Sequence, residues 1–167
     1  MDRRSFIRTA GVASLGAGML PFLKALPASA QTADTVVVAI GNTINSLDLH
    51  RSGTNRPSYQ VTINIYDRLL TFGTKKMPDG SLSYDYNTLK GELAESWTTA
   101  PDGMSVDFKI KPNAKFWDGA PVTAEDVKWS FDRALALGGF PATQMKAGSL
   151  EKPEQFEVVD ASTFRLK

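Results

Sequence analysis

The segment Val106–Ile110 alternates apolar and polar side chains. This period of two is typical of a β-strand with one face in the core and the other in solvent. The turn residues Pro101-Asp102-Gly103 stand just before it. Near the C-terminus, residues 156–160 and 163–167 surround the pair Ala161-Ser162, and this pattern predicts two more strands joined as a hairpin.

After the first of these strands, apolar side chains recur with the spacing of a helix. Thr123 begins the pattern Thr-x-x-Asp, in which the hydroxyl caps a helix and Asp126 lies in its first turn. We expect this helix to run to about Leu137, to end at Gly138-Gly139, and not to resume because of Pro141. Its buried face should consist of Val127, Phe131 and Ala134 or Leu135.

A continuous, mostly β-branched run occupies residues 35–40 and is followed by Gly41-Asn42-Thr43. Such a run predicts a strand buried on both faces, usually in a parallel sheet. In open α/β sheets, ligands bind beside the loop that follows the carboxyl end of a strand. The first candidate site is therefore the polar connection at residues 42–56, and an ordinary solvated loop is an equally simple interpretation.

A second helix is predicted after Pro57, a residue that suits the first turn of a helix. Tyr66 lies beside its apolar stripe and is expected in the core. The turn-rich residues 71–90 should form a short hairpin or an ordered loop around the turn at residues 77–80. The stripe itself consists of Val61, Ile65 and Leu69.

Two clusters could suggest catalysis or sugar binding. The adjacent Glu125 and Asp126 point to different faces of a helix, so capping explains them better than acid–base chemistry. The tryptophans Trp97, Trp117 and Trp129 are expected to pack, although a sugar-stacking platform is the alternative. An exported carbohydrate-binding module or hydrolase that uses these groups is therefore the second functional hypothesis.

Composition further narrows the range of possible functions. The chain has no cysteine and a single histidine, His50, so thiolate chemistry and multi-histidine metal sites are excluded. Formal net charge is +1, but the first thirty residues carry four basic residues against one acidic residue. The remainder is slightly acidic, which removes the main support for nucleic-acid binding. No glycine-rich phosphate loop or other cofactor motif is present, and we expect no cofactor and no metal.

The first thirty residues have the pattern of an export signal. Arg3-Arg4 is followed by a modest apolar run and then by Ala28-Ser29-Ala30, the small-x-small pattern read by signal peptidase. This arrangement is similar to a twin-arginine signal. We expect residues 1–30 to be removed on export and residues 31–167 to form the mature part.

The segment from Leu93 to Phe131 closely resembles the signature of the family 5 extracellular solute-binding proteins, the peptide, nickel and oligosaccharide receptors of ATP-binding cassette importers. Leu49 departs from the family, which commonly has proline after the Leu-Asp pair. Further segments that look like the family are Ser46-Leu47-Asp48, residues 64–70 and residues 159–166. The signature itself consists of Leu93-Ala94-Glu95-Ser96-Trp97, Pro101-Asp102-Gly103, Phe108-Lys109-Ile110-Lys111, Lys115-Phe116-Trp117-Asp118-Gly119, Pro121-Val122-Thr123-Ala124-Glu125-Asp126-Val127 and Trp129-Ser130-Phe131.

This resemblance implies an α/β fold of the type II periplasmic-binding-protein class, with a mixed sheet and an extra subdomain. Residues 31–167 would be the N-terminal part of the first lobe of a longer protein whose second lobe lies outside this sequence. The implied function is a non-catalytic, monomeric periplasmic receptor that delivers a small or peptide-like solute to a membrane permease. Together with the loop argument, it predicts ligand contacts at Asn42, Thr54, Asn55, Arg56, Phe140 and Gln144.

Overall fold

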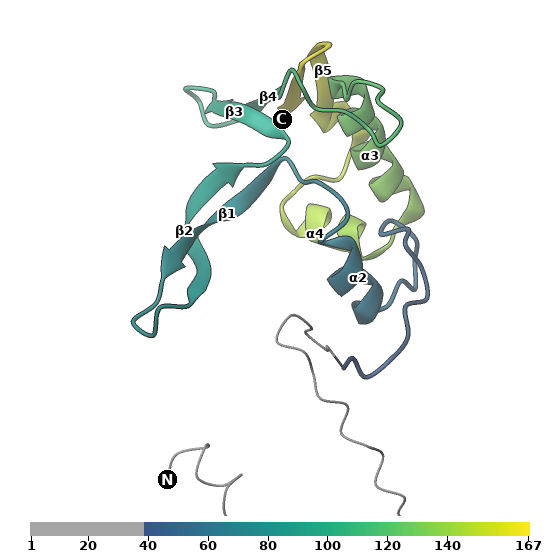
Figure 1. Cartoon of the computed structure of the whole chain (residues 1–167). Helices are drawn as coiled ribbons and strands as arrows, with labels where there is room; N and C mark the ends of the chain where they lie inside the picture. The colour runs from purple at the N-terminus through teal and green to yellow at the C-terminus, as the bar shows by residue number, and fades with distance from the viewer. Residues whose placement is uncertain (1–38) are drawn as a thin grey trace, which may run out of the picture. The chain divides into compact units, whose positions relative to one another are not determined.

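The computed structural model describes residues 39–167 (Figure 1). The expected signal at residues 1–30 and most of the expected strand at residues 35–40 lie outside this range. The end of that strand that is described, Ala39 and Ile40, is exposed and not paired with another strand. The elements in chain order are α2 (Arg56–Thr62), β1 (Leu70–Lys76), β2 (Leu82–Gly91), β3 (Ala94–Thr99), β4 (Val106–Ile110), α3 (Ala124–Leu137), α4 (Phe140–Ala147), the 3-10 turn η1 (Pro153–Gln155), β5 (Phe156–Asp160) and β6 (Thr163–Leu166).

A four-stranded antiparallel sheet has the order β3-β4-β6-β5. Its centre is the pairing of β4 with β6, in which Phe108 lies opposite Phe164. The predicted strand at 106–110 and the predicted C-terminal hairpin are both confirmed. All strand pairings among residues 39–167 are antiparallel, and the mixed sheet that the resemblance implies is not seen within this range.

Helix α3 packs against β5 and β6 and completes the core (Figure 1). The Thr123 side chain accepts from the Asp126 amide, and the Asp126 carboxylate accepts from the Thr123 amide at 2.8 Å. This capping box confirms the structural interpretation of Asp126. The helix ends at Leu137 as predicted, because Gly138 adopts a left-handed φ of 66°. The buried core comprises Ala94, Phe108, Ile110, Ala124, Val127, Phe156 and Phe164.

The expectation that Pro141 prevents a further helix is wrong. This proline lies in the first turn of α4, which begins at Phe140 directly after the Gly138-Gly139 break. Proline is accommodated there because the amide that it lacks would have no partner in a first helical turn. The proline therefore begins a helix in a new direction and does not end the previous one.

The predicted helix after Pro57 is shorter than expected. It ends at Thr62, and Ile65 and Tyr66 are 55% and 47% exposed, so the prediction of a core Tyr66 is wrong. The β-branched Val61, Thr62 and Ile63 propagate a helix poorly. The side chain of Asn64 then donates to the Gln60 carbonyl oxygen at 2.8 Å and satisfies a group at the helix end.

The predicted hairpin in residues 71–90 is confirmed as β1 paired with β2. Its turn is closed by the Gly80 amide, which donates to the Met77 carbonyl oxygen at 2.9 Å. The expectation that the tryptophans pack is wrong for Trp117 and Trp129, which are 97% and 63% exposed, whereas Trp97 is 36% exposed and thus about two-thirds buried. No helix in the described range is long and apolar enough to cross a membrane.

Candidate functional site

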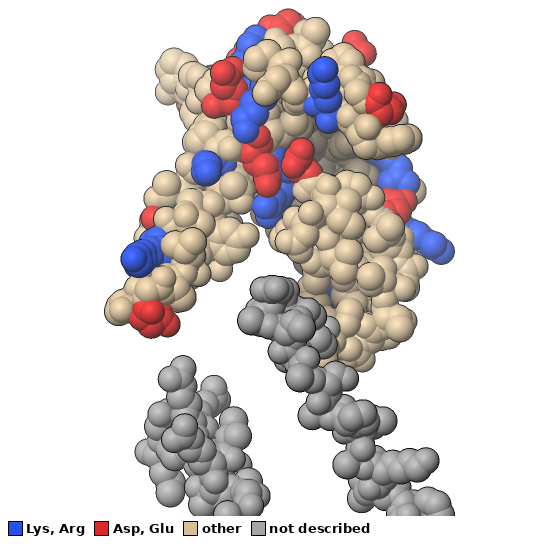
Figure 2. All heavy atoms as spheres, viewed as in Figure 1, with Lys and Arg blue, Asp and Glu red and all other residues tan. Residues whose placement is uncertain are grey.

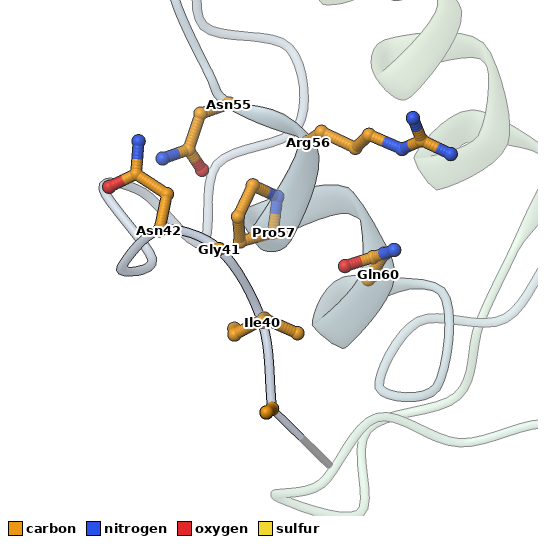
Figure 3. A pocket seen from close by; sticks show the side chains of 8 residues that line it. Ile40, Gly41, Asn42, Asn55, Arg56, Pro57 and Gln60 are labelled. Carbon is orange, nitrogen blue, oxygen red and sulfur yellow. The ribbon is translucent and has the colours of Figure 1, made fainter.

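An open hollow of about 500 Å³ lies beside the N-terminal end of α2 (Figure 3). Three of the six predicted ligand residues, Asn42, Asn55 and Arg56, line it. In Figure 3, Arg56 and Gln60 extend from one side of α2, while Asn42 and Asn55 lie on the other. The remaining lining residues are Ala39, Ile40, Gly41, Pro57 and Gln60.

The loop before α2 is folded around Ser58, which is completely buried. The Ser58 hydroxyl accepts from the amides of Asn45 and Ser46 at 3.1 and 3.2 Å. It lies 2.8 Å from Oδ1 of Asn55, to which it donates. Because the buried hydroxyl forms hydrogen bonds with all of these partners, it holds the chain before α2 against the helix. No local sequence signal marks Ser58, because its partners lie up to thirteen residues away.

Asn55 and Thr54 both hold the loop together. Asn55 is the N-cap of α2, and its Oδ1 accepts from the Ser58 amide at 3.1 Å. Its Nδ2 donates to the Thr43 carbonyl oxygen at 2.7 Å. The Thr54 hydroxyl is 2.9 Å from the carbonyl oxygens of Asp48 and Arg51, to which it donates. Direct contact of Thr54 and Asn55 with a solute stays a prediction.

Arg56 is the first residue of α2, and its side chain is exposed in the hollow. Among residues 39–167, no carboxylate lies within ion-pair distance of its guanidinium. Arg68, Arg133 and Arg165 differ from Arg56, because each of them is paired with a carboxylate. A planar guanidinium with free donors is suited to bind a carboxylate in a bidentate manner.

The second predicted segment begins at Phe140, which is 55% exposed. Its ring packs edge-on against Tyr59 of α2, with ring centroids 5.5 Å apart. The Tyr59 hydroxyl in turn donates to the Leu49 carbonyl oxygen at 3.2 Å. Phe140 is thus brought next to the loop of the first segment. Gln144 is exposed on α4 and does not line the hollow.

An ion pair that sequence reasoning missed joins this loop to α3. Nη1 and Nη2 of Arg133 donate to the two carboxylate oxygens of Asp48 at 2.8 and 2.6 Å. The hydrogen bonds from Arg133 lower the pKa of Asp48 to about 2 from its ordinary value of 3.8. The partners are 85 residues apart, so no spacing rule could pair them.

The two acidic residues considered for acid–base chemistry lie at the start of α3. Asp126 is engaged in the helix cap, and Glu125 beside it is exposed in the first turn. Burial lowers the pKa of His50, which favours the neutral form of this imidazole. Within residues 39–167, no group of three or more histidine or acidic side chains is arranged to hold a metal ion.

The Asp48–Arg133 pair predicts a specific dependence of stability on pH. Because the pKa of Asp48 is lower in the folded protein, the unfolded chain binds its proton first as the pH falls. The contribution of Asp48 to the free energy of unfolding should be complete above about pH 4 and lost as the pH falls through about 2. Urea unfolding of wild type and Asp48→Asn at several pH values should therefore give a stability difference that shrinks toward pH 2. A difference that stays constant between about pH 5 and 2 would contradict this.

A family model described as bacterial extracellular solute-binding proteins, family 5 middle, matches residues 88–167. Over 101 residues the chain is 39% identical to the probable D,D-dipeptide-binding periplasmic protein DdpA of Escherichia coli K12, covering 60% of this chain and 18% of that protein. Over 162 residues it is 32% identical to the glutathione-binding protein GsiB of the same strain, covering 96% of this chain and 28% of that protein.

The chain is also similar to proteins of known structure. The binding protein MoaA from A. tumefaciens R10, in complex with mannopinic acid, aligns with a TM-score of 0.54 and 27% sequence identity. The alignment covers 74% of this chain and 23% of that one. The chain thus spans less than a third of the length of each of these relatives.

Proposed function

Because the chain belongs to the bacterial extracellular solute-binding proteins of family 5, we propose that it serves as a receptor for a peptide-like or other small solute, which it delivers to an ATP-binding cassette permease. Its fold is of the type II periplasmic-binding-protein class, as expected. The family consists of solute-binding proteins and not of enzymes. Catalysis by the tryptophans or carboxylates has no comparable support.

The observation that carries this proposal is the exposed Arg56 in the hollow beside α2. The side-chain amides of Asn42 and Gln60 line the same hollow and add donors and acceptors suited to a peptide bond. The ligands for which the three relatives are named, a D,D-dipeptide, glutathione and mannopinic acid, all carry a carboxyl group. We therefore propose a small solute with a free carboxylate, held at Arg56.

The proposal also covers the export route, the oligomeric state and the protein partner of the receptor. We propose export to the periplasm by the twin-arginine route, a monomeric state, and a membrane permease as the protein partner. The relatives named as periplasmic support this compartment. On the face shown in Figure 2, acidic and basic side chains are interspersed, a distribution unlike the basic stripe that nucleic-acid binding requires.

The proposal is tested by binding to the whole protein. Glutathione, D-alanyl-D-alanine and mixed L-dipeptides and L-tripeptides would be screened by thermal shift, followed by calorimetry on those that stabilise. A ligand that binds only the folded state raises the unfolding midpoint by mass action. A panel with no stabilising member, or a compound that is chemically converted by the protein, would count against a receptor.

Arg56→Gln should weaken binding of the stabilising solute about ten- to hundredfold, since a charged hydrogen-bonded contact is worth roughly 1.5–3 kcal/mol. Calorimetry with the free acid and with its C-terminal amide measures this, and the amide should be insensitive to the substitution. Arg51→Gln is the matched control, because Arg51 is an exposed arginine of the same loop that does not line the hollow. Equal losses in both variants would exclude a specific role for Arg56.

A further inference from the structure

The loop that carries the candidate ligand residues is attached to α3 at one strong contact. Asp48 lies in this loop and Arg133 near the end of α3, and they share two hydrogen bonds of 2.8 and 2.6 Å. Each side chain is only about a third exposed, at 38% and 31%. The guanidinium of Arg133 also lies 5.7 Å from the ring centroid of Trp129, which restrains it further.

Asp48 also organises the loop itself. Its Oδ1 accepts from the His50 amide at 3.1 Å, and its own amide donates to the Ser46 hydroxyl at 3.0 Å. Its carbonyl oxygen accepts from the Thr54 hydroxyl at 2.9 Å. The residue held by Arg133 is therefore the one to which Thr54 is tied, and Thr54 directly precedes Asn55 and Arg56.

The second candidate segment, which begins at Phe140, follows α3 directly in the chain. After α3, Gly138 and Gly139 lead into α4, which begins at Phe140. The backbone at Gly139 passes so close to His50 that a Cβ there would lie 2.5 Å from the His50 carbonyl oxygen. The Asp48–Arg133 pair and this close approach thus set the position of the loop relative to the start of α4.

We propose that Asp48 and Arg133 are positioning residues for solute binding. They hold the loop against α3 so that Arg56 and Phe140 keep the separation that the solute requires. Neither residue touches the solute; each acts through the segments that it connects. This inference rests on the proposed receptor function, and it adds a requirement that the ligand residues by themselves would not impose. Small displacements of positioning groups weaken binding because the bound geometry must then be restored at a free-energy cost.

A second bidentate arginine–carboxylate pair elsewhere in the fold provides the control. Arg165 donates to both carboxylate oxygens of Asp107 at 2.6 and 2.8 Å, with both side chains 33% exposed. This pair joins β4 to β6 and does not contact the candidate loop. Asp48→Asn should weaken binding of the solute found in the panel above about tenfold, whereas Asp107→Asn should leave affinity unchanged while destabilising to a similar degree.

Two further measurements in the whole protein separate positioning from general destabilisation. If the pair acts as a unit, Arg133→Gln combined with Asp48→Asn should lose no more affinity than either single variant. In the unliganded protein, amide hydrogen exchange at residues 46–56 should accelerate in Asp48→Asn and not in Asp107→Asn. Equal affinity losses for Asp48→Asn and Asp107→Asn, or unchanged exchange in the loop, would overturn the proposal.

The two hypotheses fail in different ways. If the wild-type protein binds nothing in the panel, the receptor function fails, whereas the exchange measurement still tests whether the pair holds the loop. If the wild type binds and Asp48→Asn binds equally well, the receptor function stands and the positioning role is rejected.

Discussion

Replacing Phe164 by alanine is expected to lower the free energy of unfolding by about 3–5 kcal/mol, the usual range for truncating a buried aromatic ring. Phe164 is fully buried at the centre of the four-stranded sheet. Its ring centroid lies 5.1 Å from that of Phe131 on α3 and 6.5 Å from that of Phe108 on β4. Removing the ring leaves a cavity between sheet and helix that neither element can fill alone. Urea unfolding of both proteins measures the effect as a lower midpoint.

Phe116→Ala is the control for this substitution. Phe116 loses the same atoms but is 44% exposed in the turn before α3. We expect it to cost only about 1–2 kcal/mol, because nearly half of its surface stays in contact with water in the folded protein. Similar losses in the two variants would mean that Phe164 is not the centre of the core.

Gly139→Ala should cost about 1–3 kcal/mol, the range for overpacking a tight contact. The added Cβ would lie 2.5 Å from the His50 carbonyl oxygen and 3.2 Å from the Arg51 carbonyl carbon. Both of these are backbone atoms, so the loop before α2 must move as a whole to relieve the clash. We expect a lower thermal midpoint, and faster amide exchange in residues 46–56.

Gly148→Ala is the matched variant at the other end of α4. Gly139 and Gly148 flank this helix, and neither has a positive φ. A Cβ at Gly148 would meet its nearest atom, the Met145 carbonyl oxygen, at 3.4 Å. The change should therefore stay within about 0.5 kcal/mol of wild type. A larger loss from Gly148→Ala than from Gly139→Ala would contradict the close approach at Gly139.

Elements whose signals are local could be predicted from the sequence. The capping pattern at Thr123 and the glycine at 138 bounded α3 correctly, and alternation located β4 and the C-terminal hairpin. The predicted helix after Pro57 is too long, because the apolar stripe continues to Ile65 although the helix itself ends at Thr62. The β-branched residues there and the side chain of Asn64 end it. The exposed tryptophans were missed because their packing depends on neighbours that no local pattern specifies.

The candidate site, too, could be predicted only in part from the sequence. Sequence reasoning located the polar loop and Arg56, and the structure places Asn42, Asn55 and Arg56 around one hollow. It could not indicate that Asn55 and Thr54 have their hydrogen bonds taken up by the loop. Nor could it find Ser58 or Arg133 as the residues that hold this loop in place.

By itself, the sequence determined the strands, the capped helix, the turns and the family signature, because hydrogen bonding and side-chain periodicity act over a few residues. Only the tertiary structure decided which distant residues meet. Asp48 pairs with Arg133 across 85 positions, and Tyr59 packs on Phe140 across the gap between α2 and α4. Such contacts depend on how the elements pack in three dimensions, and the geometry of the candidate loop follows from them.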